Sequence, residues 1–253
     1  MELTDQNLKS DTSDVISSVS DQATSRTETA YEQIRRRILR LEIPPGGGFT
    51  EAQIAADLGL SKTPVREALA QLRRERLVQI DARSGCRAAP ATLKDTIDLA
   101  VFRGLLEGEA ASLAAGRLTD ITQLQALERL CQASYRPDDP ASIDEFLERN
   151  TAFHCTIAHA GGNDRLAAAL EDALQQMERL FRIGLMYSSR ADEIIHEHTD
   201  LLDAIKSGDA DAARSVALAQ SRAAQKMIVD GMLASPEVLS ANIGASVPRR
   251  VQP

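Results

Sequence analysis

The sequence of 253 residues is poor in cysteine and in long apolar runs, and each absence excludes a class of protein. Its three cysteines, Cys86, Cys131 and Cys155, are odd in number, widely spaced and form no CxxC pair. This argues against a disulfide framework and a structural zinc knuckle, and it is consistent with a reducing compartment. No window approaches about 18 apolar residues, and the N-terminus lacks a basic start before an apolar run. We therefore expect a cytoplasmic protein without membrane span or signal peptide.

Sequence motifs of catalysis are also missing. There is no HExxH, no Gly-x-Ser-x-Gly, no Gly-x-x-x-x-Gly-Lys and no Gly-x-Gly-x-x-Gly after a strand. The glycines at 46–48 follow no predicted strand, so we interpret them as a flexible turn. Cys155 adjoins His154, but adjacent residues of one helix point about 100° apart, which does not suit a nucleophile and its base.

Positive charge is scarce overall but concentrated in one segment. The net charge is −8, yet residues 27–90 carry 11 Lys and Arg against 8 Asp and Glu. Residues 91–253 carry 16 against 24, and residues 1–26 carry 2 against 5. Only residues 27–90 are therefore basic, which is the distribution expected when one domain of an acidic protein binds nucleic acid.

The basic segment contains a helix-turn-helix pattern at 51–72, EAQIAADLGLSKTPVREALAQL. Ala55 is small where the second helix crosses closely, and Gly59 stands where the turn needs a positive φ. Ser61 is a natural N-cap of the second helix, and Pro64 is tolerated in its first turn. The shared apolar face comprises Ile54, Leu58, Leu60, Val65, Ala68 and Leu69.

Elements on both sides complete a winged helix-turn-helix domain at 27–90. A helix is expected from Glu28 to Leu41, and after the helix-turn-helix two short strands flank a turn at Ser84 and Gly85. Residues 1–26 and 235–253 are expected to be disordered tails. Between them, residues 92–234 form an all-helical domain of six helices, so the fold class is mainly α. The expected helices span residues 92–117, 119–134, 141–160, 163–188, 190–206 and 209–234.

The start of the second helix of the pattern is the predicted DNA contact surface. A helix entering the major groove presents such residues to bases and phosphates, and Arg66 can pair bidentately with guanine. Arg35 and the wing residues are better placed for backbone contacts, which position the protein without reading sequence. The alternative is a solvated basic face on an ordinary helical domain. The predicted DNA-binding residues are Arg35, Ser61, Lys62, Thr63, Arg66, Arg83, Gly85 and Arg87.

All four histidines, His154, His159, His196 and His198, lie within the helical domain. His154 and His159 point about 140° apart on a helix and His196 and His198 about 160° apart, so neither pair chelates a metal within one helix. Structural or surface histidines are one interpretation, and a metal site joining separate helices is the other. Nearby, Arg103 interrupts an apolar stretch and needs an anionic partner, which Glu107 one turn on could supply.

Two long segments resemble the winged-helix domain of the GntR family of bacterial transcription regulators: YEQIRRRIL, then PPGGGFTEAQIAADLGLSKTPVREALAQLRRERLVQI. The helical domain resembles the ligand-sensing FadR C-terminal domain (FCD) of that family through FRGLLEGEAASLAA, FHCTIAHAGGN and EHTDLLDAIKSGDADAA. The length of this domain and its number of helices are similar to those of the VanR-like subgroup. The resemblance implies a homodimer that binds a near-palindromic double-stranded DNA operator, and a repressor of a neighbouring catabolic operon released by a small anionic effector such as a carboxylate.

The resemblance also implies a pocket whose ligands are altered here. Many such sensors hold a divalent metal with one aspartate and three histidines. This chain keeps His154 and His198 but has Asn150 and Gln220 at the other two positions. Two alternatives stay open: these four residues bind a divalent metal such as zinc more weakly, or they bind the effector directly. The arginine that matches Arg103 often faces the pocket in such sensors, which implies an effector contact for Arg103.

Arg182 is a second candidate for the effector, whereas His159 and His196 are interpreted as surface residues. The alternative function, from a different class of protein, is a metal-dependent enzyme built on a helical bundle with an accessory winged helix.

Overall fold

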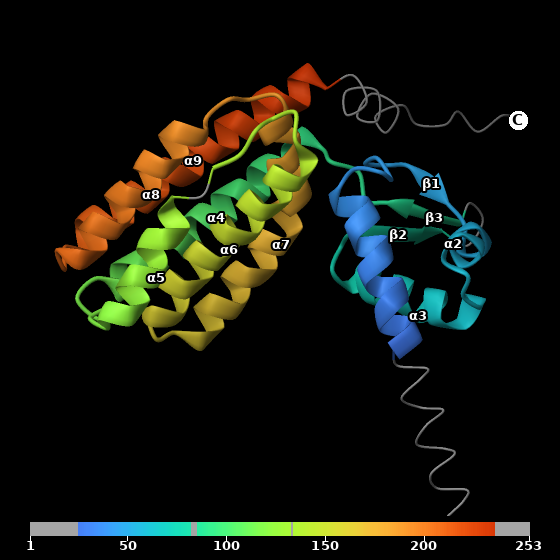
Figure 1. Ribbon diagram of the computed structural model, residues 1–253, viewed down its shortest axis with the longest axis horizontal. Coiled ribbons are helices and arrows are strands. Elements are labelled where there is room, and N and C mark those ends of the chain that lie inside the picture. The colour runs from blue at the N-terminus through green and yellow to red at the C-terminus, as the bar shows by residue number, and fades with distance from the viewer. Residues whose placement is uncertain (1–24, 82–84, 133, 236–253) are drawn as a thin grey trace, which may run out of the picture. The chain divides into compact units, whose positions relative to one another are not determined.

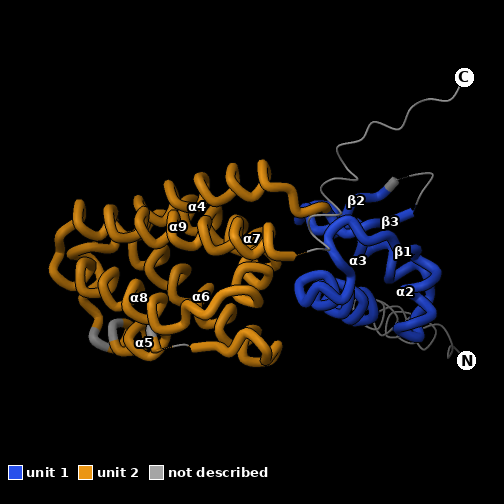
Figure 2. Tube along the Cα trace, turned by 90° about the horizontal axis from the view of Figure 1, so that it is seen from above, with its two compact units in different colours: residues 1–89 blue, residues 90–253 orange. Residues whose placement is uncertain are grey.

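The computed structural model describes residues 25–81, 85–132 and 134–235. The contacts divide the chain into two compact units, Met1–Ala89 and Pro90–Pro253 (Figure 2). Residues 1–24 and 236–253, most of the predicted tails, lie outside the described residues, as does Arg83.

The first unit begins with a helix at residues 25–39 (Figure 1). The predicted end at Leu41 was two residues too late, because Leu41 adopts a left-handed φ of 62° that a helix cannot continue through. The remaining elements are β1 (Gly48–Phe49), α2 (Glu51–Leu58), α3 (Lys62–Arg74), β2 (Val78–Asp81) and β3 (Gly85–Ala88).

Helices α2 and α3 form the helix-turn-helix. Thr50 and Gln53 make a reciprocal capping box that starts α2, and Gly59 ends it with the predicted positive φ, 65°. Ser61 occupies the predicted N-cap position of α3, and its hydroxyl makes no capping hydrogen bond. The face of α3 that packs on α2 is fully buried at Val65, Ala68, Leu69 and Leu72.

The wing contains a strand that the sequence did not predict. The antiparallel sheet has the order β1-β3-β2, in which Phe49 pairs with Cys86 and Ile80 pairs with Cys86 from the other side. Gly48 therefore begins a strand and is not part of a flexible turn. A two-residue strand has no detectable alternation, so its partner β3 decides the conformation.

The second unit contains six helices within the described residues, in agreement with the predicted fold class. Helix α4 contacts α6, α7, α8 and α9 and is the central helix of the bundle. It ends three residues before the predicted end at 117, and Gly116 follows with a φ of 76°. The helices are α4 (Leu93–Ala114), α5 (Ile121–Cys131), α6 (Pro140–Ala160), α7 (Asp164–Met186), α8 (Ala191–Lys206) and α9 (Ala210–Ala234).

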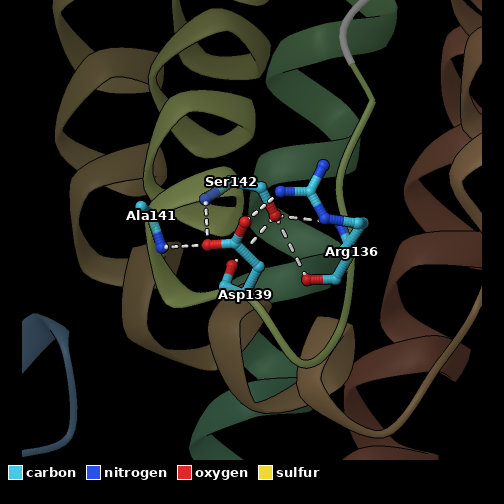
Figure 3. Close-up of polar contacts among 4 residues, drawn as sticks. All are labelled: Arg136, Asp139, Ala141 and Ser142. Carbon is cyan, nitrogen blue, oxygen red and sulfur yellow. Dashed lines mark hydrogen bonds and ion pairs between the residues drawn. The ribbon is translucent and has the colours of Figure 1, made fainter.

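A polar cap fixes where α6 begins. The Asp139 carboxylate accepts hydrogen bonds from the amides of Ala141 and Ser142, at 3.0 and 3.2 Å, and pairs with Arg136 (Figure 3). The Ser142 hydroxyl accepts a hydrogen bond from the Arg136 amide at 2.9 Å. With Pro140 as the first helical residue, this cap sets which side chains of α6 point into the bundle.

Helices α7 and α9 approach each other closely through glycine. A Cβ atom on Gly231 would lie 2.8 Å from the Cα of Gly184, a distance that real side chains do not reach. This crossing brings the two helices together next to the pocket described below. No helix in the described part of the chain is both long and apolar enough to span a bilayer.

Candidate functional site

The first turns of α3 are the exposed part of the helix-turn-helix. Ser61, Lys62, Thr63 and Arg66 are all exposed, while the opposite face of α3 packs against α2. Arg66 points its guanidinium at Glu51 in the first turn of α2, with Nη2 2.9 Å from Oε2. Sequence reasoning did not find this pair, because the two residues are fifteen positions apart on different helices.

The other predicted DNA contacts occupy three places. Arg35 is half-buried on the helix at 25–39, and Arg87 is exposed on β3. Gly85 begins β3 with a φ of 84°, and a Cβ there would lie 3.2 Å from the Phe49 carbonyl oxygen. Its role is therefore to permit the close approach of β1 and β3.

The helical unit contains a narrow pocket of about 30 Å³, lined by side chains of α4, α6, α7, α8 and α9. A space of this size holds about two water molecules, so a small molecule can enter only if the side chains of the wall move apart. Helices from distant parts of the sequence bring five predicted residues together at its wall: Arg103, Asn150, His154, His198 and Gln220.

Arg103 forms a buried ion pair in the pocket wall. Its Nε and Nη2 atoms lie 2.8 and 2.7 Å from the same carboxylate oxygen, Oε1 of Glu107, and both side chains are 3% exposed. The guanidinium also lies 4.7 Å from the centre of the Phe181 ring. Glu107 is therefore the anionic partner that the sequence suggested. The Nη1 atom of Arg103 is buried without a hydrogen-bond partner, so the guanidinium retains donor capacity.

The two pocket histidines are held neutral. Nδ1 of His154 lies 3.1 Å from Oε1 of Glu107, and the ring centres of His154 and His198 are 5.3 Å apart. Burial, reinforced by the nearby Arg103, holds the pKa of His154 well below its ordinary value. Burial, His154 and Arg103 do the same to the pKa of His198.

Three further polar atoms in this region are buried without a hydrogen-bond partner, and one of them is Oε2 of Glu107. Gln220 donates through Nε2 to the backbone oxygen of Glu197, which leaves its own Oε1 unsatisfied. Nδ1 of His198 is unsatisfied as well. Buried polar atoms without partners are costly, so these atoms and Arg103 Nη1 favour a polar ligand at this place.

Sequence reasoning missed a second ion pair of the pocket. Arg190, at the N-cap position of α8, pairs with Glu197 at 2.6 Å, and both line the pocket. No periodicity distinguishes these two residues from surface charges. Arg182, by contrast, is not part of the pocket lining. Its guanidinium is buried against the Asp144 carboxylate of α6, which accounts for its burial without a ligand.

The donor set suits a divalent metal poorly. Glu107 and His154 do form the carboxylate and imidazole pairing that often supports a metal ligand. However, the four implied ligands Asn150, His154, His198 and Gln220 include no anion, and the Arg103 charge that lowers both histidine pKa values also opposes a cation. Among the described residues, no three His, Cys, Asp or Glu side chains converge as a metal site.

The remaining histidines lie outside the pocket. His159 is exposed and contacts Glu171 at 2.7 Å, and His196 is exposed and contacts the Asp192 carbonyl oxygen at 2.7 Å. Burial raises the pKa of Cys155 to about 11, so its thiol stays protonated near neutrality and is a poor nucleophile.

The buried histidines make the stability of the helical unit depend on pH. Their folded-state pKa values lie below the unfolded value of about 6.5, so the unfolded chain takes up protons first. The free energy of unfolding is therefore highest above about pH 6.5. Below that pH it falls by up to about 1.4 kcal/mol per pH unit for each histidine. Urea unfolding at pH 7 and 5.5, in buffer with a chelator, measures this loss.

His198→Gln should reduce the loss, and His196→Gln, at an exposed position of the same helix, should leave it unchanged. The same loss in wild type and His198→Gln would contradict the assignment to this ring.

Two family models match the chain. The model "Bacterial regulatory proteins, gntR family" matches residues 26–87, which contain the helix-turn-helix and the wing. The FCD domain model matches residues 98–220, which contain all five predicted pocket residues.

Relatives extend over most of the chain. The "HTH-type transcriptional regulator in unstable DNA locus" of Streptomyces ambofaciens is 30% identical, over 87% of this chain and 92% of the relative. The protein named "Probable D-xylose utilization operon transcriptional repressor" of Paenarthrobacter nicotinovorans is 29% identical, over 73% of this chain and 82% of that one. A crystal structure of a GntR transcriptional regulator from Rhodococcus sp. RHA1 has the same fold, with a TM-score of 0.64 and 21% identity, over 81% of this chain and 98% of that one.

These matches are to transcription regulators, so the rival prediction of a metal-dependent enzyme was wrong. The chain belongs to the GntR family of bacterial regulatory proteins and is a transcription regulator with a C-terminal FCD domain.

Proposed function

We propose that this regulator is a cytoplasmic repressor that binds operator DNA through α3 and is released by a small anionic effector in the pocket. The single observation that carries the proposal is the joint presence of an exposed start of α3 and a buried polar pocket with unsatisfied atoms. Repression is supported by the relative from Paenarthrobacter nicotinovorans, whose name describes a repressor of a sugar utilization operon.

The chain offers a direct connection for this response. Arg103 lies on α4, and Thr92, the N-cap of α4, follows the end of the first unit by three residues. An effector that contacts Arg103 therefore acts on the helix to which the DNA-binding unit is tethered. It shifts the equilibrium between states only by its differential affinity for them, typically about 1 to 3 kcal/mol.

Within α3, Arg66 is proposed to read a base and Arg87 in the wing to contact phosphate. Arg66→Ala should reduce discrimination at one operator position by about 1 to 3 kcal/mol. Arg87→Ala should weaken binding to every sequence. It should also reduce the slope of log K against log salt concentration by about 0.9, because one phosphate contact is lost. Fluorescence anisotropy on a duplex selected from a random library, and on a scrambled duplex, separates the two effects. Equal losses on both duplexes for Arg66→Ala would remove it as a base reader.

Homodimerisation is proposed to use an exposed apolar face of α4. Ile97, Val101, Phe102 and Leu105 are 40, 54, 47 and 64% exposed, and three of them recur every four residues on one side of the helix. A contiguous apolar surface of this kind marks an interaction site. A second copy is the proposed occupant, because a two-fold axis crossing α4 would cover the same residues on both chains and match a near-palindromic operator.

Leu105→Glu should convert the dimer into a folded monomer, because it places a charge in the proposed interface without burying it within one chain. Light scattering after size-exclusion chromatography would show the mass falling from twice 27.4 kDa to 27.4 kDa. Leu233→Glu is the matched control, since Leu233 is 53% exposed on α9. A monomeric wild type, or a dimeric Leu105→Glu variant, would contradict this interface.

The effector is proposed to be a small carboxylate with a hydroxyl group, bound without a metal. Glu107 engages Nε and Nη2 of Arg103 and leaves Nη1 to meet an anionic oxygen. Oε1 of Gln220 is an acceptor and needs a donor such as a hydroxyl. Arginine suits a carboxylate because its planar fork offers several donors in fixed geometry.

Small hydroxycarboxylates should raise the melting temperature of the wild type, while neutral polyols of the same size should not. At a ligand concentration of 100 times Kd the stabilisation is about 2.7 kcal/mol. Arg103→Lys keeps the charge beside Glu107 but loses the fork, so the shift should disappear. Arg182→Lys, at the buried arginine outside the pocket, should retain it. Loss of the shift in both variants, or in neither, would contradict the role of Arg103.

Elemental analysis of the same protein, purified without chelators, checks the metal-free binding. About one divalent ion per chain, lost in His154→Ala, would overturn it in favour of the metal alternative.

A further inference from the structure

An exposed ion pair joins the start of α2 to the recognition helix. Its partners are Glu51, the first residue of α2, and Arg66, the fifth residue of α3. The Arg66 side chain is 68% exposed and the Glu51 side chain 30%. Pairs this exposed contribute little to folding because solvent screens them and ordering two long side chains is costly. The buried contacts between α2 and α3 already hold the helices together. The effect of the ion pair is therefore on the conformation of the Arg66 side chain and not on helix packing.

Glu51 engages one edge of the guanidinium and leaves the other free. The Nε atom of Arg66 lies 3.2 Å from each carboxylate oxygen, and Nη2 lies 2.9 Å from Oε2. Of the five N–H groups, the two on Nη1 and the second on Nη2 are not used by this carboxylate. One N–H of Nη1 and the remaining N–H of Nη2 form the fork at the end of the side chain, and such a fork can pair bidentately with O6 and N7 of guanine in the major groove.

A carboxylate at this place opposes DNA binding in general. The hydrogen bond from Arg66 lowers the pKa of Glu51, so the carboxylate is anionic near neutrality. An anion beside the DNA-facing helix is repelled by phosphates and reduces affinity for every sequence. Its compensating effect is to restrain a long side chain before DNA arrives. Ordering such a side chain on binding reduces affinity by roughly 2- to 12-fold.

We propose that Glu51 is a positioning residue for sequence recognition: it holds Arg66 by the Nε edge and presents the outer fork to a guanine. The inference rests on the proposed role of Arg66 as a base reader. Glu51 therefore lowers the affinity for all DNA and raises the discrimination at one base pair. Its removal should tighten binding to random sequence and reduce the preference for the selected sequence.

The test is selection of binding sites from a random-sequence duplex library with the full chain and its variants, followed by anisotropy on the selected and a scrambled duplex. Glu51→Ala should lower discrimination at the position read by Arg66 by roughly 2- to 12-fold, while binding to the scrambled duplex becomes tighter. Glu51→Gln keeps an acceptor for Nε and should fall between wild type and Glu51→Ala.

Asp57→Asn is the matched control. Asp57 lies on α2, as Glu51 does, and pairs with Arg37 of the helix at residues 25–39 at 2.9 Å. Its replacement removes one negative charge from α2 without a change in the contacts of Arg66. This variant should leave the selected sequence unchanged. In an Arg66→Ala background, Glu51→Ala should have no further effect on base preference, because the side chain that it positions is gone.

The outcomes separate the two claims. If Arg66→Ala leaves all base preferences intact, the base-reading role fails and the Glu51 inference fails with it. If Arg66→Ala removes a preference that Glu51→Ala retains, only the Glu51 inference is overturned. A loss of melting temperature in Glu51→Ala accompanied by equally weaker binding to both duplexes would also overturn it, because that pattern indicates a structural role.

Discussion

The buried ion pair between Arg103 and Glu107 is the interaction on which the helical unit's site depends. It lies on α4, the helix that contacts four others, so the charge cannot be moved to solvent without opening the bundle. Glu107 compensates the arginine and also orients His154, while Arg103 helps to keep both pocket histidines neutral. A single pair thus determines the charge state of the pocket, and this charge state disfavours a cation and accommodates an anionic oxygen.

The DNA-binding unit uses a carboxylate and arginine pair in a different environment. Glu51 and Arg66 are exposed, so their pair adds little to stability but can set the direction of a side chain. The same chemistry therefore supports two tasks in one chain. The buried pair of Arg103 and Glu107 affects the charge state of neighbouring side chains. The exposed pair of Arg66 and Glu51 leaves one edge of the guanidinium accessible to DNA.

Most of the fold could be predicted from the sequence because its signals are local. The six helices of the second unit were expected from apolar periodicity and from stop signals such as Gly161 and Gly208, and the turn at Gly59 was expected from the need for a positive φ. Strand β1 was not predictable, since Gly48 and Phe49 become a strand only by pairing with β3. For the site, Arg103, His154 and His198 were found, but Arg190 and Glu197 looked like surface charges.

The sequence by itself determined the architecture, because periodicity, capping residues and motif spacing are local properties of the chain. Its resemblance to a known family indicated the five residues that lie at the pocket wall. The tertiary structure alone decided which partners those residues have. It paired Arg103 with Glu107 and Arg66 with Glu51, and it directed Arg182 to Asp144 and not to the pocket. The physical reason is that an ion pair depends on where helices cross, and a crossing is set by the packing of whole faces, not by any local pattern.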